Sequence, residues 1–164
     1  MKAYTKFIIL ILLLNYSSFV ASQNYLKTDT IDCINYKLII DIPARSHSHI
    51  DKYEEGFFRT ITCYLDSAII TIHFGAMVNL PLIDLSKYTV TSNFIFDKEI
   101  QIQRGYYENE INGVKRKKFF REENYLKHGI TFMYENVDES RLPFYDSILN
   151  NIKILKTENR TDLG

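Results

Sequence analysis

The residues best suited to chemistry are two histidines in the segment SHSH, residues 46–49. Alternate residues of an extended chain point the same way, so His47 and His49 can present two imidazoles to one transition metal ion. The carboxylates of residues 51–55 follow closely and can supply a third ligand. Two histidines alone are an incomplete ligand set, and the alternative is a solvated loop. We keep His47 and His49 as metal-site candidates, and we expect no bound cofactor.

Other catalytic patterns are missing from the sequence. Acyl transfer needs a nucleophile beside a base, but the chain has no G-x-S-x-G motif and neither cysteine stands in a nucleophile motif. Paired acids such as Glu54 and Glu55 are typical of solvated charge rather than of a glycosidase pair. No glycine-rich loop is present to hold phosphate. We therefore expect a protein that is not an enzyme.

The two cysteines, Cys33 and Cys63, allow one intramolecular disulfide. Such a bridge persists in exported proteins, and in the chain-entropy model a loop of this length adds about 3.5 kcal/mol of stability. Strand alternation puts Cys63 on an apolar face but Cys33 in phase with polar residues. We expect the Cys33–Cys63 disulfide, with two unpaired thiols as the alternative.

The first 22 residues predict export. Two lysines precede an apolar run at residues 7–14, and Val20 and Ser22 occupy the positions that define a cleavage site. The apolar run is too short for a membrane-spanning helix, which needs about 20 residues. We expect residues 1–22 to be a cleaved signal peptide, and the mature protein to be secreted or periplasmic without a membrane span.

Size and charge narrow the class of protein. The signal segment holds two of the 20 Lys and Arg residues and none of the 20 acidic ones, so the mature chain has a net charge of −2. This balance gives no reason to expect nucleic acid as a partner. We expect one domain at residues 23–155, rich in sheet because aromatic and β-branched residues abound, and a disordered tail at residues 156–164.

Alternating apolar residues predict the strands. The segment INYKLIIDIP, residues 34–43, is typical of a half-buried strand. Further strands are expected at 88–96, at 100–110 and in HGITFMYENV, residues 128–137. The polar residues 23–30 and 44–56 are expected to be a lead segment and a surface loop. The strongest turn signal, Asn112-Gly113, predicts a hairpin that sets Glu110 opposite Lys115, Glu108 opposite Lys117 and Tyr106 opposite Phe119.

A second hairpin is expected at residues 57–75, with a two-residue turn at Asp66-Ser67. That register pairs Cys63 with Ile70 and puts the apolar residues of both strands on one face. The opposite face is our candidate binding surface. It carries Thr60, Thr62, Thr71 and His73, together with the aromatic residues Tyr106, Tyr107, Phe119 and Phe120.

The pattern changes to a helical period near the C-terminus. Apolar residues recur at Leu142, Tyr145, Leu149 and Ile152, which predicts an amphipathic helix at about 140–151, followed by a short strand at 152–155. The expected fold class is α+β, with a mostly antiparallel sheet of six or seven strands and a C-terminal amphipathic helix packed on one face.

The strand GITFMYEN followed by the helix SRLPFYDSILNNI, with the opening strand YKLIIDIP, resembles the PsbP/Mog1-like α+β proteins. Members of that family serve as binding or assembly modules. We therefore expect a non-enzymatic binding or assembly module whose partner is an envelope or extracellular protein or ligand. The alternatives are a small secreted hydrolase that uses His47 or His49, and an inhibitor or immunity-type partner of a secreted protein.

Overall fold

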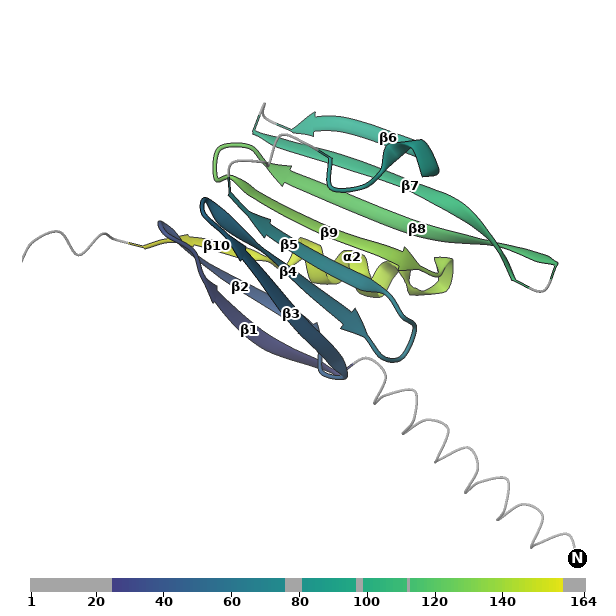
Figure 1. The fold of residues 1–164 in the computed structure, drawn as a ribbon, viewed down its shortest axis with the longest axis horizontal. Helices are drawn as coiled ribbons and strands as arrows, with labels where there is room; N and C mark the ends of the chain where they lie inside the picture. Colours follow the sequence, from purple (N-terminus) through teal and green to yellow (C-terminus); the bar gives the residue numbers. More distant parts are fainter. Residues whose placement is uncertain (1–24, 76–80, 97–98, 112, 158–164) are drawn as a thin grey trace, which may run out of the picture.

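The computed structural model describes residues 25–75, 81–96, 99–111 and 113–157. The predicted signal peptide lies outside the described residues, as does the predicted tail from residue 158 onward. The described chain forms two antiparallel sheets and one short C-terminal helix, so the sheet-rich α+β prediction is confirmed (Figure 1).

The larger sheet has seven strands in the order β3-β4-β5-β9-β8-β7-β6. They are β3 (Ser46–Tyr53), β4 (Gly56–Cys63), β5 (Ile69–Phe74), β6 (Thr89–Phe96), β7 (Ile100–Ile111), β8 (Val114–Tyr125) and β9 (Ile130–Val137). The smaller sheet has the order β1-β2-β10, from β1 (Leu26–Asp32), β2 (Tyr36–Pro43) and β10 (Lys153–Lys156). Two sheets thus replace the predicted single sheet of six or seven strands, and β10 includes Lys156 of the predicted tail.

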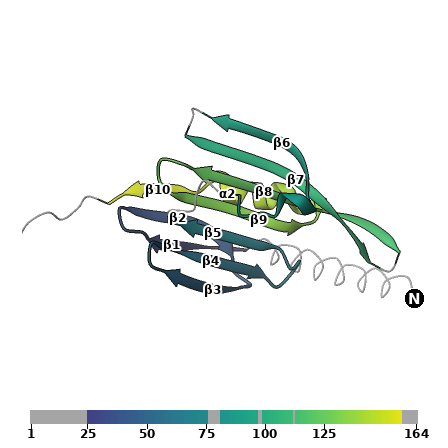
Figure 2. The ribbon, with the colours of Figure 1, turned by 45° about the horizontal axis from the view of Figure 1, so that its top comes forward.

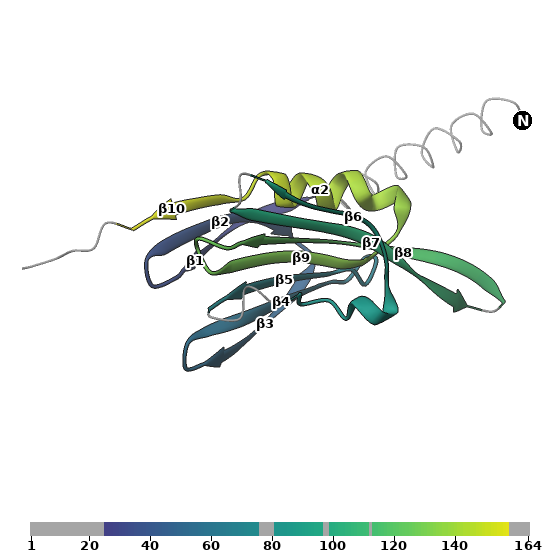
Figure 3. The same cartoon turned by 90° about the horizontal axis from the view of Figure 1, so that it is seen from above.

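The smaller sheet and the helix α2 (Leu142–Asn150) form a second layer against one face of the larger sheet, which we call the inner face (Figures 2 and 3). Hydrophobic burial holds the layers together. The buried core takes side chains from both layers, including Leu38, Ile40 and Ile42 of β2, Ile61, Ile70, Ile72 and Phe132 of the larger sheet, and Tyr145, Ile148 and Leu149 of α2.

The C-terminal helix forms close to its predicted place. A 3-10 turn, η2 (Glu139–Arg141), leads into α2, and Pro143 lies in the first turn, where its missing N–H breaks no helical hydrogen bond. The helix is held on β8 by Arg121, whose guanidinium donates to Asp146 Oδ1 at 2.8 Å and to Asn150 Oδ1 at 2.7 Å. The same guanidinium pairs with Glu123. Polar contacts, together with apolar packing, therefore hold the helix on the sheet.

Residues 81–88, which include the 3-10 turn η1 (Leu85–Lys87), cover part of the outer face of the larger sheet. A second buried cluster forms there from Ile83, Phe120 and Met133. The segment is held by the buried Glu122, whose Oε2 accepts the backbone N–H of Leu82 at 2.9 Å and of Ile83 at 3.2 Å. One buried carboxylate thus attaches this segment to the sheet.

The predicted β7–β8 hairpin is confirmed in detail. Glu110 pairs with Lys115, Glu108 with Lys117 and Tyr106 with Phe119. Gly113 has φ +77°, as the predicted turn requires. The hairpin projects well beyond the other strands (Figures 1 and 3).

The predicted register of the β4–β5 hairpin is wrong by two residues. The Cys63 N–H donates to the carbonyl of Ala68, so the connection is longer than two residues, with Ser67 at φ +58°. The observed pairs are Ile61 with Ile70, Thr60 with Thr71 and Phe58 with His73. A shift of two residues preserves the faces of both strands, so Ile61 and Ile70 still point into the core.

Candidate functional site

A groove opens between the two layers along β1 and β3, the end strands of the smaller and the larger sheet. It has two adjoining lobes of about 220 Å³ and 240 Å³, which share Asp32, Lys52 and Phe57 as lining residues. We call it the β1–β3 groove. Within the described residues, β1 pairs only with β2 and β3 only with β4, so both strands have one backbone edge without a strand partner.

Strand pairing positions the side chains of the larger sheet in the groove. Ile50 lies opposite Arg59 and Lys52 opposite Phe57, all on the inner face that also carries Ile61. The smaller sheet is too narrow to cover β3, and Ile50 remains 47% exposed. The groove therefore has an apolar floor at the open edge of the layered structure.

Arg59 connects the layers beneath the lobe that Ile50 lines. Its guanidinium forms an ion pair with Asp29 of β1, and its Nε donates to Ser48 Oγ at 2.9 Å. The Arg59 side chain is only 12% exposed. The ion pair joins β1 to β4 across the two layers at the groove.

The other lobe lies between two turns and is rich in acidic side chains. Asp32, Glu54 and Glu55 line it together with Lys52. Asp32 also lies 3.6 Å from Lys37, but both side chains are exposed, so this pair is weak. This end of the groove therefore favours a cationic group.

Two further side chains of this lobe, Cys33 and Tyr53, have raised pKa values. Burial, followed by the charge of Asp32, raises the pKa of Cys33 to about 11, so its thiol is protonated and a poor nucleophile near neutral pH. Burial and then Glu55 raise the pKa of Tyr53, whose hydroxyl donates to the carbonyl of Phe74 at 3.1 Å. Neither shift makes its group a better nucleophile near neutral pH.

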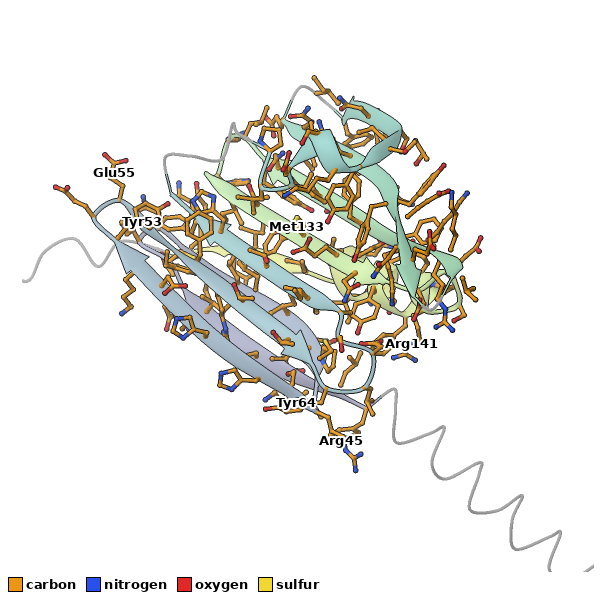
Figure 4. All side chains as sticks on the ribbon, turned by 45° about the vertical axis from the view of Figure 1, so that its right-hand side comes forward. Arg45, Tyr53, Glu55, Tyr64, Met133 and Arg141 are labelled. Atoms are coloured by element: carbon orange, nitrogen blue, oxygen red, sulfur yellow. The ribbon has the colours of Figure 1, made fainter. Side chains whose placement is uncertain are left out.

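The predicted Cys33–Cys63 disulfide is wrong, because both cysteines are free thiols. Cys33 lines the groove beside Phe57, whereas Cys63 lies at the far end of β4. Six residues of strand span about 20 Å, far beyond the roughly 7 Å that a disulfide allows between Cα atoms. Figure 4 shows the length of the β3–β4 hairpin, with Tyr53 and Glu55 at one end and Tyr64 at the other.

The metal-site candidates lie on β3, which forms where a surface loop was expected. His47 and His49 point to the outer face, away from the groove, and His49 Nε2 lies 2.9 Å from Asp51 Oδ1. In the described part of the chain, no three His, Cys, Asp or Glu side chains are grouped to hold a metal ion. The groove and the two histidines therefore form separate surfaces of one strand.

The predicted threonine surface is divided in the structure. Thr60, Thr62 and Thr71 lie half-buried on the outer face, but His73 is fully buried, with its ring stacked on Phe58 at a centroid distance of 4.3 Å. Burial lowers the pKa of His73, which favours the neutral form of its imidazole. The predicted aromatic residues also divide between the two faces. Tyr107 and Phe120 lie on the outer face, where both rings contact Tyr88. Tyr106 and Phe119 lie opposite each other on the inner face.

Sequence reasoning missed the groove because it missed both strands that border it. The polar segment SHSHIDKY forms β3, and LKTDTID forms β1. A signal was present, since the expected loop at residues 44–56 had 13 residues without structure, which is long for a compact domain. The alternation of serine with histidine was the further indication of a strand.

No helix among the described residues has both the length and the apolar character needed to cross a membrane. Comparisons with protein-family models, with curated proteins and with solved structures found no match for this chain.

Proposed function

We propose that this protein is a secreted, non-enzymatic binding module that holds an extended segment of another protein in the β1–β3 groove. The observation that carries the proposal is the groove itself, an apolar floor bordered by two strands that each have one free backbone edge in the described structure. An extended segment can add hydrogen bonds to such an edge while its alternate side chains enter the groove.

The lining residues indicate what the segment contains. Phe57 and Ile50 offer contact to an apolar side chain, and the lobe with Glu54 and Glu55 offers carboxylates to a lysine or arginine. The preferred segment therefore carries a basic residue close to an apolar one. The free strand edge supplies affinity, and the two lobes supply specificity.

The test is a selection of linear peptides on the mature protein, residues 23–164, followed by calorimetric titration of a selected peptide. We expect enriched sequences to combine basic and apolar residues, and Ile50→Glu to weaken binding at least about tenfold by placing a charge in the apolar lobe. His47→Glu is the matched control, because His47 is exposed on the same strand but on the opposite face.

Failure to enrich any peptide would contradict the proposal. So would a selected peptide whose affinity is unchanged by Ile50→Glu but reduced by His47→Glu, since this result would move binding to the outer face.

A further inference from the structure

The strand β6 is the end strand of the larger sheet on the side opposite the β1–β3 groove. It pairs with β7 from Phe96 opposite Ile100 to Thr89 opposite Tyr106, with a bulge between Val90 and Ser92. Among the described residues no strand pairs with its other edge. A row of backbone donors and acceptors is therefore available to a further strand.

This edge differs in charge from the other three. Charged side chains on an edge strand oppose pairing with a copy of the same strand, because the same charges are brought together. Charges are present on β1 (LKTDTID), β3 (SHSHIDKY) and β10 (KILK), but β6 has the sequence TVTSNFIF and carries none. Three edges therefore carry charges that disfavour self-pairing, and the fourth edge carries none.

The exposed side chains of β6 are also apolar. Phe94 is 47% exposed, Ile95 62% and Phe96 56%. Phe94 and Phe96 lie on the inner face, opposite Ile102 and Ile100. They lie beyond β7, β8 and β9, the strands that contact Asp146 of α2. Ile95 points to the outer face. Both faces of the free edge therefore gain from burial.

We propose that β6 pairs antiparallel with β6 of a second copy of this chain, so that two larger sheets join into one continuous sheet across a two-fold axis. The second copy is favoured by charge. Self-pairing of β1 about its centre would set Asp29 opposite Asp29, and self-pairing of β10 would set Lys153 opposite Lys156. Self-pairing of β6 brings no charge opposite a like charge, and an identical strand supplies the same apolar surface in return.

The bulge sets the register. The regular part of β6 after the bulge is Ser92–Phe96, and its centre is Phe94. A two-fold axis at that centre places Phe94 opposite Phe94 of the second copy, and Ser92 opposite Phe96. Facing aromatic side chains contribute further to such a strand pair.

The experiment is sedimentation of the mature protein, residues 23–164, at about 1 to 100 µM, a range that covers typical weak and moderate dimers. We expect a dimer, and we expect Ile95→Lys to raise the dimer dissociation constant at least about tenfold by placing a like charge on each strand. Val114→Lys is the matched control. Val114 is 55% exposed on the β7–β8 hairpin, and its substitution should leave the dimer unchanged.

A second measurement tests the register. Phe94→Cys in a Cys33→Ser, Cys63→Ser background should form a disulfide between copies under mild oxidation, because directly opposite residues lie within disulfide reach. Ile95→Cys, which lies opposite Asn93 in this register, should cross-link less. A mature protein that is monomeric across the whole concentration range would overturn the proposal, as would an Ile95→Lys variant that dimerises as strongly as the wild type. The groove borders the other end of the sheet, so these results are independent of the proposed peptide binding.

Discussion

Arg121 is a buried cation that faces two carboxylates from different elements. The Arg121 side chain is 5% exposed, and the Glu123 side chain with which it pairs is 4% exposed. Arg121→Met keeps much of the side-chain volume but leaves Glu123 buried without a cation. We expect this variant to lose about 3 to 5 kcal/mol in the free energy of unfolding, measured by urea denaturation.

The matched control for Arg121→Met is Arg116→Met, which removes an exposed arginine from the same strand. Its effect should be within about 0.5 kcal/mol. If Arg121→Met were as stable as the wild type, the buried ion pair would contribute nothing beyond packing.

Glu122 makes stability depend on pH. Burial raises the pKa of this carboxyl above its ordinary value of 4.5, although Asn124 and the backbone of Ile83 and Leu82 donate to it. The folded state therefore binds the proton more tightly than the unfolded state does. The resulting stabilisation is complete below the ordinary pKa and is lost as the pH rises through the raised value.

We expect the free energy of unfolding of the wild type to fall relative to that of Glu122→Gln as the pH increases from about 4 to about 7. Urea denaturation at several pH values measures this difference. Glu110→Gln controls for the loss of one exposed carboxylate. A difference between wild type and Glu122→Gln that stays constant or grows with pH would contradict the argument.

At the scale of the elements, the attachment of β6 to β7 depends on Gly105. A Cβ atom at this position would lie 2.2 Å from the carbonyl oxygen of Thr89 on β6 and 2.6 Å from Phe120 Cε1. Gly105→Ala therefore forces β6 away from β7. We expect a loss of about 1 to 3 kcal/mol in stability and faster hydrogen exchange in residues 89–96.

The companion variant Gly113→Ala introduces backbone strain without a steric clash, whereas Gly105→Ala introduces a clash. Gly113 has φ +77°, and nothing lies within 4 Å of an added Cβ. Its substitution should cost about 1 kcal/mol through backbone strain without accelerating exchange in β6. Equal exchange in β6 for both alanine variants would show that Gly105 does not control the attachment.

The elements that sequence reasoning placed well are those with a strong local pattern. The β7–β8 hairpin was predictable because the Asn-Gly turn fixes its register, and α2 because its apolar residues recur at helical spacing. The polar edge strands β1 and β3 were not, because neither shows a clear apolar alternation. The β4–β5 register depended on a turn length that only the contacts of Asp66 and Ser67 reveal.

The candidate site was less predictable for the same reason. The β1–β3 groove exists because two strands without apolar alternation face each other from different sheets. The candidate metal ligands, His47 and His49, share β3 with the groove but point away from it. Predicting the groove required knowing that β1 and β3 are strands, which the residue types alone do not show.

The β1–β3 groove and the free edge of β6 have one structural origin in the molecule as a whole. Among the described residues, the larger sheet has seven strands, whereas the second layer has three strands and one helix. The second layer covers the middle of the inner face, so in this part of the chain the end strands β3 and β6 each keep one edge without a strand partner. The β3 end carries charges and a groove, and the β6 end is neutral and apolar. These differences favour a foreign segment at one end and a second copy at the other.

The ion pair between Asp29 and Arg59, whose side chains are 28% and 12% exposed, joins the smaller sheet to the larger one. A double-mutant cycle with Asp29→Ala, Arg59→Ala and the double variant isolates this pair, because the separate contact of Arg59 with Ser48 cancels in the cycle. We expect a coupling free energy of about 1 to 2 kcal/mol, measured by urea denaturation.

The exposed pair Lys127 and Glu99, 64% and 50% exposed, is the control, and its cycle should give about 0.5 kcal/mol or less. If the Asp29–Arg59 pair positions the two borders of the β1–β3 groove, Arg59→Ala should also weaken the binding of any peptide selected on the wild type. This effect would be indirect, because the guanidinium is already paired with Asp29. A coupling no larger than that of the control pair would mean that apolar packing alone positions the smaller sheet, and the groove would then keep its peptide affinity in Arg59→Ala.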